Sequence, residues 1–435
     1  MNFEILKRSH VKRNIIIGVV VVLIISAVIL NFTRARYRVT QSIDLVNGTI
    51  NYTLPDLNIV GLYIDGAEAT ELDSTKTYTL DTTQSTCTYK DGTQISNLNI
   101  SYDSETGNLT ITPFTTKGTK CTLYFNEQVF AKDTILANYP TQTTRTNFRT
   151  TVTNTTTGTI YYADTSKGRT YYFAGNPTDN WVRWAGFYWR IIRINEDGTI
   201  RMIYQGTSAN TTGTETQTQT SAFNSSYYDD NAGVGYMYQS NQVHGLASSS
   251  TIKGVLDEWY QNNLASHAND IDMNAGFCGD RTPSTSSSSI NNSGGTGTTT
   301  TYYAGYVRYY GNTSLTPTFE CTNDSDLYTT SGSSDGNKAL QYPIGLISMD
   351  EVWYAGGYQA NNTSYYLYTR QFYWTMSPYG FSYGFAHMFV VASSGALSSN
   401  RVNYTYGVRP AINLRADITI SSGNGTASNP YVIAT

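Results

Sequence analysis

Apolar and polar positions alternate along most of the chain with the two-residue period of β-strands. The strongest case is residues 186–194 and 199–204, two apolar and aromatic runs separated by a turn sequence that ends in Asp197-Gly198. Such a turn between two alternating runs predicts a β-hairpin. We therefore expect antiparallel strands in the part of the chain from residue 159 onward.

Two segments have the spacing of helices instead. Residues 251–264 follow Ser250, a residue type that caps helix N-termini, and they place their apolar side chains on one face. Residues 348–354 begin with a serine and carry two acidic residues in the first turn, which suits the helix dipole. Two helices among many strands predict an α+β fold.

The same patterns predict two domains. Turn signals divide residues 39–128 into short alternating segments, which are typical of a small immunoglobulin-like β-sandwich. Nothing in that segment points to catalysis, so we assign it the role of a stalk. Residues 129–158 are rich in threonine and have little apolar periodicity, which predicts a linker or an extended lead-in to the next domain. The remaining residues, 159–435, form the large domain.

An uninterrupted apolar run at residues 15–30 changes this picture near the N-terminus. Together with the next two residues it would span roughly 27 Å as a helix, close to the ~30 Å hydrocarbon core of a bilayer. We predict a single-pass transmembrane anchor at residues 15–32, a basic cytoplasmic segment at residues 1–14, and the bulk of the chain outside the cell. A cleaved signal peptide is the alternative, although the residues around Ala27 and Ala35 make poor cleavage sites.

The chain has four cysteines, and two fall in each predicted domain. Cys87 and Cys121 flank the later strands of the stalk, whereas Cys278 and Cys321 flank a low-complexity segment of the large domain. Because the chain is expected outside the cell, where disulfides persist, we predict the bonds Cys87–Cys121 and Cys278–Cys321. Free buried thiols are the alternative for the first pair.

Composition and motifs exclude several classes of function. A formal charge of −4 and 14% charged residues argue against binding nucleic acid, which requires many lysines and arginines. The four histidines lie far apart or near the membrane, and no metal-binding spacing, nucleophile motif or phosphate loop is present. We therefore predict no enzyme, no metal and no cofactor. A cell-surface enzyme acting on cell-wall or glycan substrates through scattered acidic residues is the alternative.

The stretch at residues 372–414 mixes two kinds of residue. Short apolar runs that contain Trp374, Val390, Val408 and Ile412 have the character of buried strands. Between them lie aromatic rings mixed with serine, asparagine and arginine, the composition of binding surfaces on antibodies. The alternative is that this stretch is a tyrosine-rich turn region without a binding function. The predicted ligand-binding residues are Phe381, Ser382, Tyr383, Phe385, His387, Asn400, Arg401, Asn403, Tyr404 and Tyr406.

The segments 373–378, 394–397 and 406–414 resemble the end of C-type-lectin-fold domains of gut bacteria. That group includes formylglycine-generating-enzyme-like folds and the variable proteins of diversity-generating retroelements. The resemblance implies a fixed scaffold with diversified residues near its C-terminus. Formylglycine-generating activity is not implied, because no cysteine follows Cys321, and the calcium-binding sugar motifs of animal lectins are absent.

These observations predict a membrane-anchored ligand-binding protein displayed on the cell surface, either an adhesin or a receptor. Its expected ligand is an extracellular protein or a glycan. The predicted residues should lie together on one face, with the four apolar framework residues beneath them.

Overall fold

The computed structural model describes residues 58–74, 76–104, 106–112, 118–284, 294–311 and 316–434. The chain divides into two compact units, Met1–Val129 and Phe130–Thr435. The predicted cytoplasmic segment and transmembrane anchor, residues 1–32, lie outside the described residues. Among the residues that are described, no helix is long and apolar enough to cross a membrane.

The first unit is built from seven described strands around a small core. They are β1 (Asn58–Ile64), β2 (Ala67–Ala69), β3 (Thr77–Leu80), β4 (Thr86–Thr88), β5 (Asn99–Asp103), β6 (Asn108–Thr112) and β7 (Lys120–Gln128). Five of them form one sheet around β7, which pairs with β1, β3 and β4. The hairpin of β5 and β6 contributes Ile100 and Ile111 to the same core as Leu123 and Phe125 of β7, so two layers of strands enclose it.

Both predicted disulfides are present. Cys87 and Cys121 lie directly opposite each other in the pairing of β4 with β7, and their sulfur atoms are bonded in the core of the first unit. Cys278 and Cys321 are bonded in the second unit, 43 residues apart in sequence. Two disulfides are consistent with a protein outside the reducing cytosol.

The larger sheet of the second unit contains the predicted hairpin. Its main strands are β8 (Thr141–Thr143), β10 (Thr159–Thr165), β11 (Gly168–Tyr172), β13 (Trp181–Trp184), β14 (Phe187–Ile194), β15 (Ile200–Gly206), β26 (Ala411–Leu414), β27 (Ile420–Ser422) and β28 (Tyr431–Ile433). β14 and β15 pair in antiparallel fashion as the sequence predicts. The C-terminal strands return to this sheet, because β26 pairs with β15 and β28 with β13.

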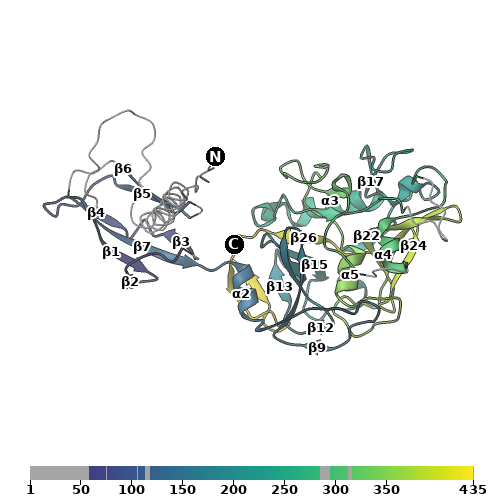
Figure 1. The fold of residues 1–435 in the computed structure, drawn as a ribbon, viewed down its shortest axis with the longest axis horizontal. Helices are drawn as coiled ribbons and strands as arrows, with labels where there is room; N and C mark the ends of the chain where they lie inside the picture. The colour runs from purple at the N-terminus through teal and green to yellow at the C-terminus, as the bar shows by residue number, and fades with distance from the viewer. Residues whose placement is uncertain are drawn as a thin grey trace, which may run out of the picture. The chain divides into compact units, whose positions relative to one another are not determined.

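A second, six-stranded sheet carries the region of the predicted binding residues. It consists of β16 (Gln219–Ser221), β20 (Thr301–Tyr302), β22 (Tyr373–Ser382), β23 (Phe385–Val391), β24 (Leu397–Arg401) and β25 (Tyr406–Val408). The helices α4 (Ala304–Tyr310) and α5 (Met349–Tyr354) lie beside β22 (Figure 1). Trp374, Val390, Val408 and Ile412 are fully buried, as expected for the framework.

Both predicted helices form, and their starting residues act as caps. In α3 (Thr251–Asn263), the Ser250 side chain accepts a hydrogen bond from the backbone N–H of Lys253. In α5, Ser348 and Glu351 form a reciprocal capping box that satisfies two backbone N–H groups. The second unit is therefore a strand-rich mixture of α and β structure.

The structure contradicts the prediction that residues 129–158 form a linker. Apart from Val129, these residues belong to the second unit, where α2 (Ala131–Ala137) contributes Ile135 to the core, followed by Tyr139 and Phe148. β8 and β9 (Thr155–Thr156) then pair with β10 and β12 (Asn176–Pro177). The apolar residues are too widely spaced to give a period, and threonine suits edge strands as well as linkers.

Candidate functional site

The tip of the hairpin that joins β22 to β23 presents a tyrosine to solvent. Ser382 and Phe385 are paired, so Tyr383 and Gly384 form a two-residue loop with backbone φ angles of 52° and 77°. Positive φ at both positions defines a type I′ turn, in which asparagine followed by glycine is the preferred sequence. Tyr383 is 93% exposed. A bulky residue in this conformation costs on the order of 1 kcal/mol.

One face of the sheet below this tip carries an arginine packed on an aromatic ring. The guanidinium carbon of Arg401 lies 3.6 Å from the centre of the Phe385 ring. The ring of Tyr228, which comes from the segment after β16, stacks against Phe385. His387 is paired with Arg401 across the strands. Burial lowers the pKa of His387, and the positive charge of Arg401 adds to the effect, so the imidazole is neutral at pH 7.

Another group of predicted residues lies on the opposite face. The side-chain amide of Asn400 donates a 2.6 Å hydrogen bond to the hydroxyl of Tyr406, whose ring packs at 6.2 Å from that of Tyr404. Asn400 and Arg401 are consecutive in β24, so their side chains point to opposite sides of the sheet. The predicted residues thus do not share one face but occupy both sides of the same sheet edge.

The structure contradicts the prediction that Phe381 and Ser382 belong to the binding surface, because both residues are buried. Phe381 is only 1% exposed, and its ring belongs to the hydrophobic core of the second unit. Ser382 is 8% exposed. The two positions resemble their exposed neighbours in sequence, but the packing of the second unit buries both. The other eight predicted residues, from Tyr383 to Tyr406, keep part of their side chains accessible.

Two exposed tyrosines that the sequence analysis did not select also border this sheet. Tyr228 comes from the polar segment after β16, and Tyr310 ends α4. Tyr310 belongs to a cluster of rings with Tyr306 and Tyr379, and Tyr379 in turn lies 6.3 Å from His387. The adjacent tyrosine pairs at 227–228 and 309–310 are the sequence feature that could have indicated these two residues. We call Tyr228, Tyr310, Tyr383, Phe385, Arg401, Tyr404 and Tyr406 the aromatic rim.

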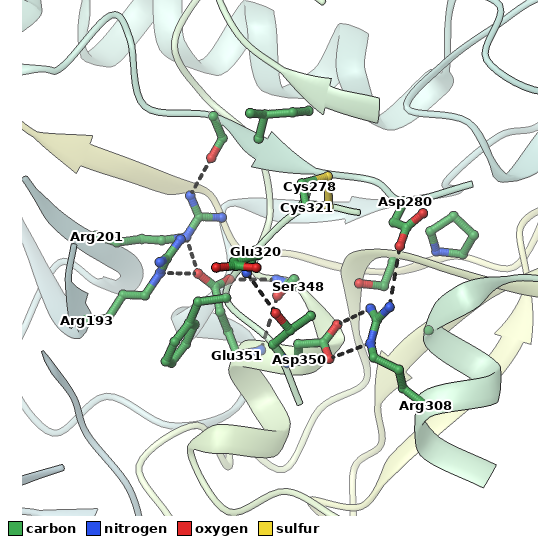
Figure 2. Close-up of a pocket in the computed structure, with 17 residues that line it drawn as sticks. Arg193, Arg201, Cys278, Asp280, Arg308, Glu320, Cys321, Ser348, Asp350 and Glu351 are labelled. Carbon is green, nitrogen blue, oxygen red and sulfur yellow. Dashed lines mark hydrogen bonds and ion pairs between the residues drawn. A yellow bond between two sulfur atoms is a disulfide. The ribbon is translucent and has the colours of Figure 1, made fainter. Parts of the chain in front are cut away.

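A cavity of about 40 Å³ elsewhere in the second unit is lined by paired charges (Figure 2). We call it the paired-charge cavity. Glu351 of α5 accepts a 3.0 Å hydrogen bond from Nε of Arg193 and forms an ion pair with Arg201, whose Nε lies 2.5 Å away. Nη2 of Arg308 lies 2.8 Å from an Asp350 oxygen, and Nη1 lies 3.4 Å from Asp280.

The electrostatics of the paired-charge cavity favour ionised carboxylates. Burial alone would raise the pKa of Glu351, but attraction to Arg201 and Arg193 outweighs it, and the pKa is lowered. The backbone N–H of Ser166 likewise lowers the pKa of Glu320, which also lines the cavity. A general acid needs a carboxyl group that holds its proton near neutral pH. This arrangement instead connects α5 to the larger sheet and to the loop held by Cys278–Cys321.

Comparison with known proteins finds a family model that matches part of this region. Residues 319–416 match a family described as a domain of unknown function, DUF6273. The match includes α5, the hairpin of β22 and β23, and the strands up to β26. No curated protein matches the chain. No solved structure matches it either.

Proposed function

We propose that this chain is a ligand-binding protein displayed on the cell surface, an adhesin or a receptor, whose contact surface is the sheet edge that carries the aromatic rim, with rim residues on both faces of the sheet. The observation that carries the proposal is Tyr383, which is held at positive φ with 93% of its surface exposed. A conformation that asparagine would adopt at lower cost is here used to hold a large ring in solvent. Backbone strain of this kind concentrates at functional sites.

The neighbours of Tyr383 support the same proposal. Among the described residues of the second unit, the exposed large apolar or aromatic side chains are Tyr228, Met273, Tyr310, Tyr383 and Tyr404. Four of these five are tyrosines of the aromatic rim. Tyrosine and arginine are enriched among the residues that contribute most to binding energy. Rings with few rotatable bonds lose little entropy when a partner covers them.

We further propose that residues 15–32 anchor the chain in the membrane and that the second unit has a C-type-lectin-like scaffold. The two disulfides and the apolar run at residues 15–30 support a position outside the cell. The resemblance of segments 373–378 and 406–414 supports the scaffold. A ligand in this setting is an extracellular protein or a glycan.

An enzyme on the same scaffold has less support. It requires a pocket with a carboxyl or imidazole group poised for proton transfer. The paired-charge cavity measures about 40 Å³, and its buried glutamate is held ionised by two arginines. That volume is close to the share of a single water molecule in the liquid, about 30 Å³.

The decisive experiment measures adhesion of cells that display the full chain. Wild type and Tyr383→Asn are compared on a glycan array and on immobilised extracellular matrix proteins. Asparagine suits the turn, so the variant should remain folded while losing the ring. We expect binding to fall about fivefold or more, the effect of about 1 kcal/mol at an interface.

The matched control is Tyr89→Asn, which changes a tyrosine that is 37% exposed in the first unit. It should leave adhesion unchanged. If Tyr383→Asn binds every tested surface as well as wild type does, or if Tyr89→Asn loses as much, the aromatic rim is not the contact surface.

A further inference from the structure

The second unit contains another cavity, with a volume of about 210 Å³ and a polar lining. We call it the arginine cavity. Its buried lining comes from β13, β14, the end of β15 and the loop after α5, and consists of Trp181, Arg190, Gln205, Thr211, Tyr365 and Tyr366. Its exposed lining consists of Asn176, Asn210, Thr212, Thr363 and Ser364. The cavity thus has a closed floor and an open rim.

Arg190 forms a cationic floor without an acidic partner. It is 5% exposed, its Nε donates to the side-chain oxygen of Asn180 at 2.6 Å, and its Nη2 donates to the carbonyl of Pro177 at 2.8 Å. Its guanidinium lies 4.2 Å above the Trp181 ring. Within the described part of the chain, Nη1 has no hydrogen bond and Arg190 has no salt bridge. Two of its three nitrogens are therefore fixed, and one remains available to a ligand.

A second buried cation lies behind the cavity wall. Arg409 is fully buried, and its Nη2 donates to the side-chain oxygen of Gln205 at 2.6 Å and to the carbonyl of Tyr204 at 3.0 Å. It too has no salt bridge to any described residue. Burial lowers the pKa of Arg190 to about 9, and repulsion by Arg409 contributes to that lowering.

Asp179 attracts Arg190 electrostatically but forms no salt bridge with either of these two cations. Its carboxylate accepts a 2.6 Å hydrogen bond from the backbone N–H of Gly158 and forms no salt bridge with a described residue. Burial raises its pKa, so it holds its negative charge less firmly than an ordinary aspartate. Burying charge without a partner is costly, and the cost falls when a ligand supplies the opposite charge. The arginine cavity therefore attracts anions.

Tyr366 lines the cavity beside Arg190 and carries a buried hydroxyl that is unpaired within the described part of the chain. Its side chain is 4% exposed and lines the cavity, and its ring lies 5.2 Å from the Arg190 guanidinium. Its hydroxyl is buried and has no hydrogen-bond partner among the described residues. Buried hydroxyls are nearly always hydrogen-bonded in folded proteins.

We propose that the arginine cavity binds a sugar acid, a hexuronate whose carboxylate pairs with Arg190. Guanidinium groups match the planar geometry of carboxylates. The hydroxyl and amide groups of Thr212, Thr363, Ser364 and Asn210 suit the hydroxyls of a pyranose ring, and Trp181 and Tyr366 offer apolar ring surface. A cavity of 210 Å³ corresponds to about seven water volumes of ~30 Å³, which fits one monosaccharide.

This binding site is independent of the aromatic rim, since the two share no residue. The test is isothermal titration calorimetry on the purified full chain with D-glucuronate, D-glucose and inorganic phosphate. A further titration uses the methyl β-glycoside of glucuronate in place of free glucuronate. Comparing the two affinities distinguishes a site for a free sugar acid from a site for the terminal residue of a glycan. We expect both glucuronate forms to bind and glucose to bind at least tenfold more weakly, because glucose lacks the carboxylate.

The most informative variants change the charge of the exposed rim and leave the buried floor intact. Ser364→Asp adds a negative charge to the exposed rim of the cavity, where it repels an anionic ligand, and should weaken glucuronate binding about tenfold. Ser364→Asn introduces a side chain of nearly the same shape as aspartate but without charge, and should weaken glucuronate binding much less than Ser364→Asp does. A third variant changes the floor itself: Arg190→Lys keeps the charge but loses the Nη1 donor and the hydrogen bonds that position it, and should also weaken glucuronate binding.

Three results would overturn the proposal. They are the absence of glucuronate binding to the wild-type chain, equal binding of glucose and glucuronate, and equal effects of Ser364→Asp and Ser364→Asn. Phosphate binding as tight as that of glucuronate would also count against it, since the sugar-binding rim would then contribute nothing. Binding of free glucuronate without its methyl glycoside assigns the site to a free sugar acid.

Discussion

The two cavities of the second unit contain similar residues and differ in how their charges are matched. In the paired-charge cavity, Arg193 and Arg201 share Glu351, and Arg308 bridges Asp280 and Asp350. At the arginine cavity, Arg190 in the floor and Arg409 behind the wall are both buried, and both are hydrogen-bonded to neutral oxygens. The first cavity holds about 40 Å³ of space, and the second about 210 Å³.

This difference separates a structural cluster from a site that is ready for a ligand. When each buried cation meets a carboxylate, the charges offset one another's desolvation and little space remains. When the cations meet only carbonyl and amide oxygens, a net positive potential remains and the open volume admits an anion. Buried arginines by themselves therefore do not indicate a binding site. The decisive features are the missing counter-charge and the space beside it.

The largest effect on stability is expected when the paired-charge cavity loses its carboxylate and so becomes electrostatically similar to the arginine cavity. Glu351→Gln preserves shape but leaves Arg193 and Arg201 without a negative partner. Removing one member of a buried ion pair costs about 3–5 kcal/mol, because the remaining charge stays buried. Urea denaturation of the full chain, followed by the fluorescence of its tryptophans, measures the loss in free energy of unfolding.

The same variant has a signature in its pH dependence. The pKa of Glu351 is lowered in the folded protein, so its contribution to stability is present above its ordinary pKa of about 4.5 and is lost as the pH falls below that value. Glu351→Gln should lack this acid-sensitive component. A loss of less than 1 kcal/mol with an unchanged pH profile would mean that the ion pairs do not stabilise the fold.

A smaller effect is expected from opening the loop at the paired-charge cavity. The disulfide Cys278–Cys321 lines that cavity and joins residues 43 positions apart. The double variant Cys278→Ser/Cys321→Ser should lose about 2–4 kcal/mol of stability, mainly because the unfolded chain gains freedom. Non-reducing peptide mapping verifies the bond in the wild type.

The disulfide also sharpens the comparison between the cavities. No residue of the arginine cavity lies in the loop between Cys278 and Cys321. The double variant should therefore bind glucuronate with wild-type affinity at temperatures where it is folded. A large loss of glucuronate affinity in the folded variant would show that the two cavities are coupled.

The smallest expected effect is a gain in stability, in contrast to the two losses above. Tyr383→Asn should stabilise the protein by about 0.5–1 kcal/mol, because asparagine is favoured at positive φ and at the first loop position of a type I′ turn. Thermal unfolding of Tyr383→Asn, compared with Tyr89→Asn in the first unit, isolates the turn effect. A destabilised Tyr383→Asn would mean that the ring supports the fold and is not kept for binding.

Features that depend on neighbouring residues could be predicted from the sequence. The Asp197-Gly198 turn, the Ser250 and Ser348 caps and the buried Trp374 are set by local hydrogen bonds or by the alternation of apolar residues. The disulfides could be predicted because each pair falls within one domain. By contrast, spacing at residues 129–158 was too irregular to reveal that they join the core.

Only the tertiary structure decided which polar and aromatic residues meet. Phe381 and Tyr383 look alike in the sequence, but the first is buried in the hydrophobic core, while the hairpin turn exposes the second. Arg193 and Glu351 are 158 residues apart, and nothing near either one indicates its partner. The sequence by itself determined the local elements and the buried framework, because their energies arise from nearby residues. Charge pairing, exposure and cavity volume required the packed chain, because they depend on groups from distant segments.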